Sequence, residues 1–250
     1  MSRIDLFKKD LRAKKAVKII AGIDNYDKDN VRNVVMAASK AGASAVDICA
    51  DEDIIRMVQE ISTIPVFVSS IEPQKLLTAK ELGVDGLEIG NFDALYRKGL
   101  RISAEEVYNL TSEVRALVGD EIFLSVTIPG HIEVSEQIEL ARRLENLNVD
   151  LIQTEGASVA NIDNNGARGL MEKVNVSVAN TIEIINNCDI PVMTASGITT
   201  TTCTLPFAIG ASAIGVGSCV NKLSTPIEMI AVIKTLMEKV GLKRESFELV

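Results

Sequence analysis

Short apolar segments alternate with longer amphipathic segments along the whole chain. The apolar segments are rich in Val and Ile, which is typical of buried parallel strands. They predict strands at Val17–Ile23, Ala45–Ala50, Pro65–Ser69, Gly86–Gly90, Ile122–Thr127, Leu151–Thr154, Pro191–Ala195 and Ala213–Gly217. The segments between them carry apolar residues at helical spacing. They predict helices at Lys28–Ala41, Glu52–Ser62, Pro73–Leu82, Ser103–Val118, Val134–Leu147, Ala167–Asn187, Thr199–Ile209 and Pro226–Val240.

Eight strand–helix units in succession favour parallel strands joined by right-handed crossovers. The segment Ile64–Gly90 is repeated in pattern by Ile190–Gly217, as two equivalent half-barrels would require. The 250 residues match the usual length of a (β/α)₈ TIM barrel, and no linker divides residues 1–250. We therefore predict one barrel domain, and the apolar face of Ser2–Lys15 predicts an N-terminal helix that closes its bottom.

Composition excludes several classes of function. A net charge of −8 argues against nucleic acid as a partner, and no apolar run is long enough to span a membrane. The four cysteines are scattered and there is one histidine, so neither a zinc site nor another metal or cofactor is expected. The expected partner is a small molecule, and assembly into a homo-oligomer stays open.

Two glycine-containing loops follow the last two predicted strands. They read Ala195-Ser-Gly-Ile and Gly215-Val-Gly-Ser. In TIM barrels a phosphate commonly binds at these loops, through free amide groups and the start of a short helix. The predicted phosphate ligands are Ser196, Gly197, Gly217 and Ser218, with a short helix starting at Ser218. The alternative is that both loops are tight turns that need glycine only for their geometry.

Polar residues interrupt the strands at alternating positions. Alternation leaves the other face of each strand apolar, for packing under the helices, so the polar set should point into the barrel. Lys18 is expected to pair there with Asp47 or Glu88, because an unpaired buried charge is costly. These three residues are predicted either as catalytic acid–base groups or as a buried ion pair. Further polar residues near the strand ends are predicted to orient a substrate: Asn91, Thr127, Gln153 and Glu155.

Two functions fit this pattern. The first is a metal-independent lyase or isomerase that acts on a phosphorylated metabolite by proton transfer. The second is a non-catalytic barrel that senses or carries a phosphorylated ligand. The depth of Lys18 separates them, since a lysine sealed beneath packed side chains cannot reach a substrate. His131, in the loop after the fifth strand, could transfer protons at neutral pH, but a solvated surface histidine is the favoured alternative. The loop Ala157–Gly166 is expected to be a lid over the mouth.

The chain resembles the family of the hypothetical chloroplast reading frame (Ycf) numbered twenty-three, from algal plastids and cyanobacteria. The matching segments are Lys18–Gly22, Val46–Asp51, Pro65–Ser70, Glu88–Ala94, Ile152–Gly156, Ala195–Ile198 and Ile214–Ser218. The resemblance covers nearly the whole chain. It implies a barrel fold and a location in the cyanobacterial cytoplasm or the plastid stroma, and it implies no particular activity.

Overall fold

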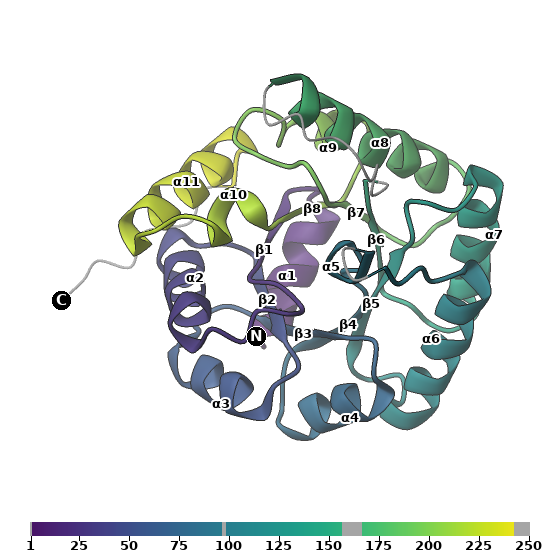
Figure 1. The fold of residues 1–250 in the computed structure, drawn as a ribbon, viewed down its shortest axis with the longest axis horizontal. Coiled ribbons are helices and arrows are strands. Elements are labelled where there is room, and N and C mark those ends of the chain that lie inside the picture. Colours follow the sequence, from purple (N-terminus) through teal and green to yellow (C-terminus); the bar gives the residue numbers. More distant parts are fainter. Residues whose placement is uncertain (1, 97–98, 157–166, 243–250) are drawn as a thin grey trace.

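Eight parallel strands close into a barrel in the order β1 to β8, which confirms the predicted (β/α)₈ fold. The structure is a computed structural model, and it describes residues 2–96, 99–156 and 167–242. Figure 1 looks down the barrel, with the strands inside a ring of helices. The strands are β1 (Ala16–Ile20), β2 (Ala45–Cys49), β3 (Val66–Ser70), β4 (Gly86–Ile89), β5 (Phe123–Ile128), β6 (Leu151–Thr154), β7 (Val192–Thr194) and β8 (Ala213–Val216).

The helices fall into an outer ring and a few short pieces. The described helices are α1 (Arg3–Arg12), α2 (Lys28–Ala41), α3 (Glu52–Ile61), α4 (Pro73–Glu81), α5 (Asp93–Tyr96), α6 (Ala104–Val118), α7 (Val134–Glu145), α8 (Ala167–Ile185), α9 (Leu205–Ala208), α10 (Ser218–Asn221) and α11 (Pro226–Lys239). Capping boxes begin α6 at Ser103 and α11 at Thr225, where each hydroxyl accepts the amide hydrogen of the glutamate three residues later. Within the described residues, no helix combines the length and hydrophobicity needed to cross a bilayer.

The predicted helix Thr199–Ile209 is mostly wrong, because only Leu205–Ala208 is helical. Threonine side chains organise the segment before it. The amide of Thr199 donates to Thr202 Oγ1, and that hydroxyl donates to the carbonyl of Gly197 at 2.9 Å. Such local side-chain bonds offer the backbone an alternative to helical hydrogen bonds.

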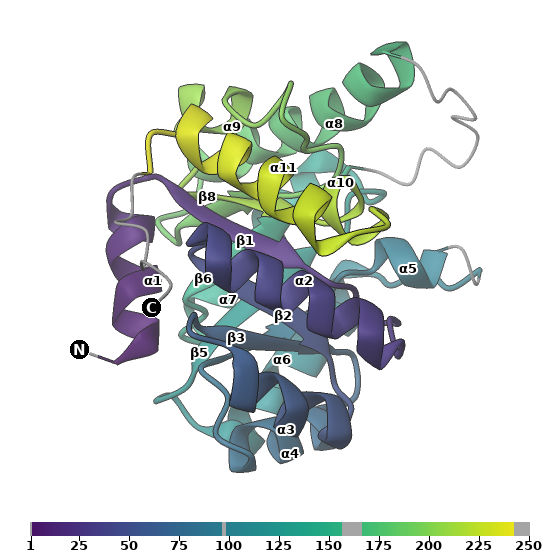
Figure 2. The ribbon, with the colours of Figure 1, turned by 90° about the vertical axis from the view of Figure 1, so that its left-hand side faces the viewer.

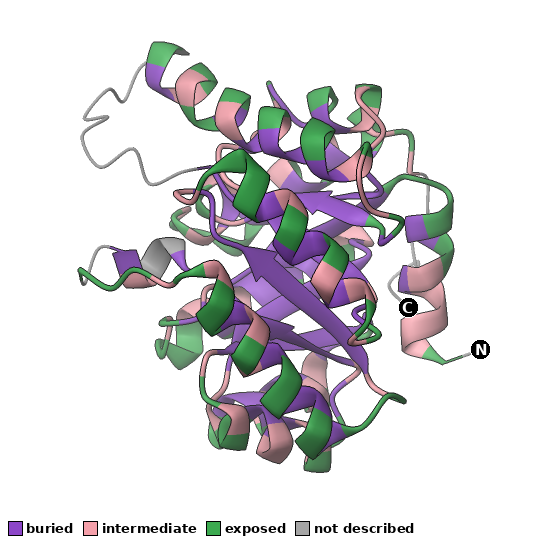
Figure 3. Cartoon of the chain, turned by 90° about the vertical axis from the view of Figure 1, so that its right-hand side faces the viewer, coloured by how far each residue is buried: buried purple, intermediate pink, exposed green. Residues whose placement is uncertain are grey.

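The barrel interior has an apolar lower layer that α1 seals. Phe7 of α1 contacts Phe67 and Phe123 edge-on, at centroid distances of 5.0 and 5.6 Å. Leu151 and Met193 complete the same buried cluster. Figure 2 shows α1 at one end of the barrel and α5 at the other, and Figure 3 shows the buried strands between them. The prediction that an N-terminal helix closes the bottom is confirmed.

We expect Phe7→Leu to lower the free energy of unfolding by about 1 kcal/mol, because it removes two edge-on ring contacts while keeping most of the volume. Urea denaturation followed by circular dichroism measures this loss. Tyr26→Leu is the control, since Tyr26 is exposed. Equal stability of the Phe7 variant and the native chain would mean that α1 does not seal the barrel.

Candidate functional site

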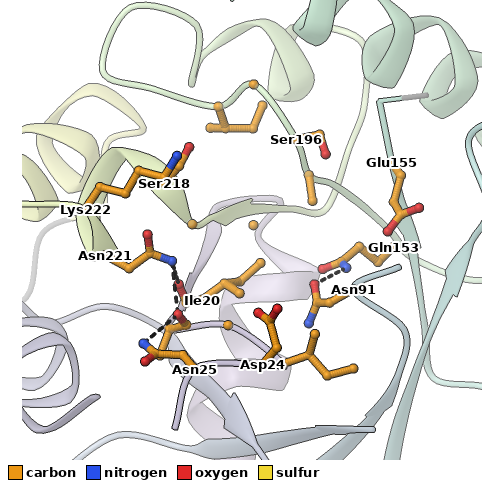
Figure 4. A pocket seen from close by; sticks show the side chains of 18 of the residues that line it. Ile20, Asp24, Asn25, Asn91, Gln153, Glu155, Ser196, Ser218, Asn221 and Lys222 are labelled. Carbon is orange, nitrogen blue, oxygen red and sulfur yellow. Dashed lines mark hydrogen bonds between the residues drawn. The ribbon is translucent and has the colours of Figure 1, made fainter. Parts of the chain in front are cut away.

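The C-terminal ends of the strands surround a cavity of about 720 Å³. Its walls come from the loops after β1, β4, β6, β7 and β8. Figure 4 shows Ser218 and Lys222 on one side of this cavity and Gln153 and Glu155 on the other. The opposite end of the barrel is filled by the phenylalanine cluster. The mouth is therefore where a ligand has room.

Both glycine loops line this one cavity. Ser196, Gly197, Gly217 and Ser218 all lie on its wall. The amide groups of Gly197, Gly217 and Ser218 donate no hydrogen bond to another described residue. Gly197 has φ +73°, and a Cβ there would lie 2.8 Å from the backbone nitrogen of Val174. Glycine at this position thus lets the β7 loop pack against α8.

Two lysines on the cavity wall escaped the sequence analysis. Lys222 follows α10, and Lys173 belongs to α8. Both are exposed, so they add positive charge to a chain whose net charge is −8. Lys222 lies four residues after Ser218, and this spacing could have indicated that it lies near the predicted phosphate loop. Lys173 belongs to α8, and the sequence pattern does not show which side of that helix is turned toward the cavity.

Three hydrogen-bonded side chains form the floor of the cavity: the amides of Asn91 and Gln153 and the hydroxyl of Thr127. We call this set the amide floor. Gln153 Nε2 donates to Asn91 Oδ1 and to Thr127 Oγ1, both at 3.0 Å. The backbone amide of Asn91 donates to the same threonine hydroxyl at 3.2 Å. Asn91 and Gln153 face the cavity, whereas Thr127 supports them from the side away from it.

Two unusual backbone conformations place Asn91 across the barrel. Gly90 has φ +147°, a value that glycine adopts readily, and Asn91 has φ +64°, a value that favours glycine or asparagine. A Cβ at Gly90 would lie 1.9 Å from Thr127 Oγ1. The end of β4 therefore packs directly on β5 and then turns its asparagine inward.

A buried charge cluster lies directly beneath the amide floor. Lys18 and Glu88 form an ion pair across the barrel, and Asp47 accepts hydrogen bonds from Ser69 Oγ and, at 3.0 Å, from Asn91 Nδ2. Lys18, Glu88 and Asp47 have no exposed surface, and they do not line the cavity. The structure thus pairs Lys18 with Glu88 and separates all three groups from the mouth by the amide floor.

Burial sets the ionisation of Asp47. Loss of solvation raises the pKa of Asp47 to about 7, and the negative charge of Glu88 adds to this effect. The ammonium of Lys18 and the hydrogen bonds from Ser69 and Asn91 act in the opposite direction. Since two carboxylates share one ammonium and all three groups are fully buried, Asp47 is protonated for part of the time near neutral pH.

Three buried side-chain oxygens in the barrel interior have no hydrogen-bond partner among the described residues: Glu88 Oε1, Ser125 Oγ and Gln153 Oε1. The first two belong to residues below the amide floor. Gln153 is different, because it is only 1% exposed and yet lines the cavity. Its oxygen is therefore an acceptor held at the cavity floor.

Glu155 and His131 meet at Tyr96, a residue that the sequence analysis did not single out. Tyr96 Oη donates to Glu155 Oε2 at 3.0 Å, and the Tyr96 ring packs edge-on against His131 with centroids 5.0 Å apart. His131 is half-buried rather than fully solvated, and its Nδ1 has almost no exposed surface. Burial, followed by the charge of Arg101, lowers the pKa of His131. The predicted lid Ala157–Gly166 lies outside the described residues.

Asparagines fix the loop after β1 to the loop after β8. Asn221 Nδ2 donates to the carbonyls of Ile20 and Ala21, at 3.1 and 3.0 Å, and Asn30 Nδ2 donates back to the Asn221 carbonyl. Figure 4 shows the bond to Ile20 at the edge of the cavity. These contacts tie the last residue of α10 to the end of β1 and to α2, next to the β8 loop.

The fold is shared with many solved structures, and the sequence with a smaller group. The α subunit of tryptophan synthase from Legionella pneumophila is 14% identical with a TM-score of 0.64, covering 96% of this chain and 99% of that one. The structure titled 3-hexulose-6-phosphate synthase is 13% identical with a TM-score of 0.63, covering 89% of this chain and 98% of that one. These likenesses show the barrel fold alone.

The sequence relatives confirm the resemblance to the plastid reading frame. "Uncharacterized protein ycf23" of Cyanophora paradoxa is 40% identical over 244 residues, which cover 96% of this chain and 97% of the relative. A family model described as "Protein of unknown function (DUF561)" matches residues 2–246. This chain therefore belongs to the DUF561 family, and the ycf23 proteins are its sequence relatives.

Proposed function

We propose that the mouth of this barrel binds a small phosphorylated metabolite. One observation carries the proposal. The loops after β7 and β8 line the same cavity, and the amides of Gly197, Gly217 and Ser218 donate to no other described residue. Amide groups that converge without partners form a site for an anion, and a phosphate monoester offers several acceptor oxygens.

The surrounding charges support a phosphate at these loops. Lys222 and Lys173 line the cavity beside them, and Ser196 and Ser218 add hydroxyl groups. Asn91, Gln153 and Glu155 line the other side, where the rest of the ligand would lie. We assign the phosphate to the loops and the orientation of the ligand to these three residues, with Thr127 supporting them from below.

The depth of Lys18 favours binding over catalysis by the buried cluster. A catalytic acid or base must come within hydrogen-bond reach of its substrate. Lys18, Glu88 and Asp47 are fully buried, and none of them lines the cavity. We therefore assign to them the support of the amide floor, and we favour a barrel that senses or carries its ligand over a lyase or isomerase that uses these groups.

The comparisons agree with this proposal at the level of the fold. One structural neighbour bears the name 3-hexulose-6-phosphate synthase, so a barrel of this shape can serve a phosphorylated compound. The plastid reading-frame name of the sequence relatives supports a site of action in a plastid or a cyanobacterium. The cytoplasm or the stroma is the compartment we propose.

We expect Ser218→Asp to weaken phosphate binding roughly tenfold or more, because it places a carboxylate where the anion would sit. The fold should survive, since an acidic residue at the start of α10 suits the helix dipole. Isothermal titration calorimetry with inorganic phosphate and a panel of phosphorylated metabolites measures the effect.

Ser224→Asp is the matched control, because it adds the same charge at an exposed serine that does not line the cavity. It should bind like the native chain. Equal affinities of the two variants, or no phosphorylated compound that binds the native chain, would refute the proposed function.

A further inference from the structure

We infer that the ligand is a hydroxylated phosphate monoester, such as a sugar or polyol phosphate, with one hydroxyl bonded to Gln153 Oε1. The inference rests on the proposed function, since it concerns the part of the ligand beyond the phosphate. The observation is the side-chain oxygen of Gln153, which has no partner among the described residues although the side chain is 1% exposed. A buried acceptor left without a donor destabilises the site, so a ligand that supplies the donor binds more tightly.

The orientation of the Gln153 amide follows from its neighbours. The Asn91 Nδ2 group donates to Asp47 Oδ2 at 3.0 Å and to Ser69 Oγ at 2.9 Å. The Asn91 oxygen must therefore point toward Gln153, and Gln153 Nε2 donates a hydrogen bond to it.

A flipped Gln153 amide would set two carbonyl oxygens against each other, so the hydrogen-bond network excludes it. The carboxylate of Asp47 thus directs, through Asn91, an oxygen rather than an amino group toward the ligand. This gives the buried cluster a positioning role in recognition.

The Gln153 oxygen lies beside Gly215. A Cβ built on Gly215 would lie 3.3 Å from Gln153 Oε1, and 3.1 Å from Ala195 Cβ and from Ile20 Cδ1. Gly215, Ala195 and Ile20 all line the cavity. A side chain at position 215 would press on the Gln153 oxygen, so glycine leaves that side of the acceptor uncovered, with Ala195 and Ile20 as its apolar neighbours.

The two subsites are close enough for one small molecule. Gly215 and Gly217 are two residues apart at the end of β8, which places their Cα atoms roughly 7 Å from each other. A phosphate on the Gly217 amide and a hydroxyl beside Gly215 thus belong to a ligand with a short carbon chain. A simple alkyl phosphate fills the first subsite and leaves the Gln153 oxygen unpaired.

The test compares matched pairs of ligands by calorimetry on the native chain. Sugar and polyol monophosphates of three to six carbons are each paired with the alkyl phosphate of equal length. At least one hydroxylated member should bind roughly tenfold or more tightly than its alkyl partner, because only the hydroxyl satisfies the Gln153 oxygen. Inorganic phosphate serves as the probe for the phosphate subsite alone.

A glycine pair then locates the effect. Gly215→Ala puts a methyl group beside the Gln153 oxygen, so it should remove the preference for the hydroxylated ligand and leave inorganic phosphate binding within about twofold. Gly217→Ala, whose added Cβ meets no atom closer than 3.8 Å, adds its methyl group at the phosphate end and should weaken both ligands alike. The comparison of ligands on the native chain decides the inference even if Gly215→Ala does not fold.

The outcomes separate the two proposals. If every alkyl phosphate binds as well as its hydroxylated partner, the inference about Gln153 fails and the phosphate site stands. If neither inorganic phosphate nor any monophosphate binds, the proposed function itself fails. If the native chain prefers the hydroxylated ligand and a folded Gly215→Ala variant keeps that preference, the hydroxyl group binds elsewhere and the inference is overturned.

Discussion

Replacement of Lys18 by Met should lower the free energy of unfolding by about 3–5 kcal/mol near neutral pH. Lys18 is the ion-pair partner of Glu88, and its positive charge also acts on Asp47, with all three groups fully buried. Methionine fills much of the same volume but leaves two carboxylates in a site without solvent. The loss of a charge partner in such a site exceeds the loss of packing, so the electrostatic effect dominates.

The effect of Lys18→Met should depend on pH. In the native chain the folded-state pKa of Asp47 is about 7, above the ordinary value of about 4 for an aspartate. The folded state therefore keeps a proton that the unfolded state releases, and this group's contribution to stability falls as pH rises from about 4 to about 7. Without Lys18 the folded-state pKa rises further, so the variant should be least stable in alkaline solution and regain stability in acid.

Urea denaturation of both chains across this pH range measures the effect. Lys40→Met is the control, since Lys40 is exposed and the same formal charge is removed. A surface substitution of this kind usually changes stability by about 0.5 kcal/mol or less. A loss below about 1 kcal/mol for Lys18→Met, independent of pH, would show that the buried ion pair contributes little to stability.

Gly90→Ala should lower the free energy of unfolding by about 3 kcal/mol or more, which combines overpacking with a strained φ. The added Cβ would lie 1.9 Å from Thr127 Oγ1 and 2.2 Å from Thr127 Cβ, and φ at Gly90 is +147°. Relief of the clash requires β4 and β5 to separate where they carry the amide floor. The affinity for a phosphorylated ligand should fall along with the stability.

Gly119→Ala is the matched control for this variant. Gly119 also has a positive φ, of +71°, but a Cβ there meets nothing within 4 Å. It should show the strain of the backbone alone, about 1 kcal/mol. Thr127→Gly in the background of Gly90→Ala should restore part of the stability by removing the clash. A double variant as unstable as Gly90→Ala alone would contradict this account of the contact.

The barrel and the inward direction of its polar residues could be predicted because both follow from period-two alternation in eight strands. Lys18, Asp47 and Glu88 lie inside as the pattern requires. The choice of Glu88 as the partner of Lys18 could not be predicted, since it depends on the stagger of the closed barrel. The register sets Lys18 beside Ala45 and Gly215, two small residues that leave its long side chain room to cross the interior.

The amide floor was beyond sequence reasoning for a different reason. Asn91 covers the charge cluster only because Gly90 and Asn91 both adopt positive φ values, which no periodic pattern encodes. The same holds for Tyr96, in a helix of four residues that the pattern did not reveal. Lys173 reaches the cavity from α8. Its orientation toward the cavity depends on how the first turns of α8 pack against Gly197.

The amide floor connects the two parts of the account. It shields the buried charges from the cavity, and it uses one of them to orient the group that faces a ligand. Asp47 accepts from Asn91, and Asn91 in turn accepts from Gln153. The buried ion pair therefore has a role in the site without reaching a substrate.

A crystal structure with a bound sugar or polyol phosphate tests the central claim most directly. We predict that the phosphate will lie within hydrogen-bond distance of the Gly197, Gly217 and Ser218 amides, with one hydroxyl donating to Gln153 Oε1. A phosphate bound outside the loops after β7 and β8, with those amides turned away from the ligand, would contradict the account.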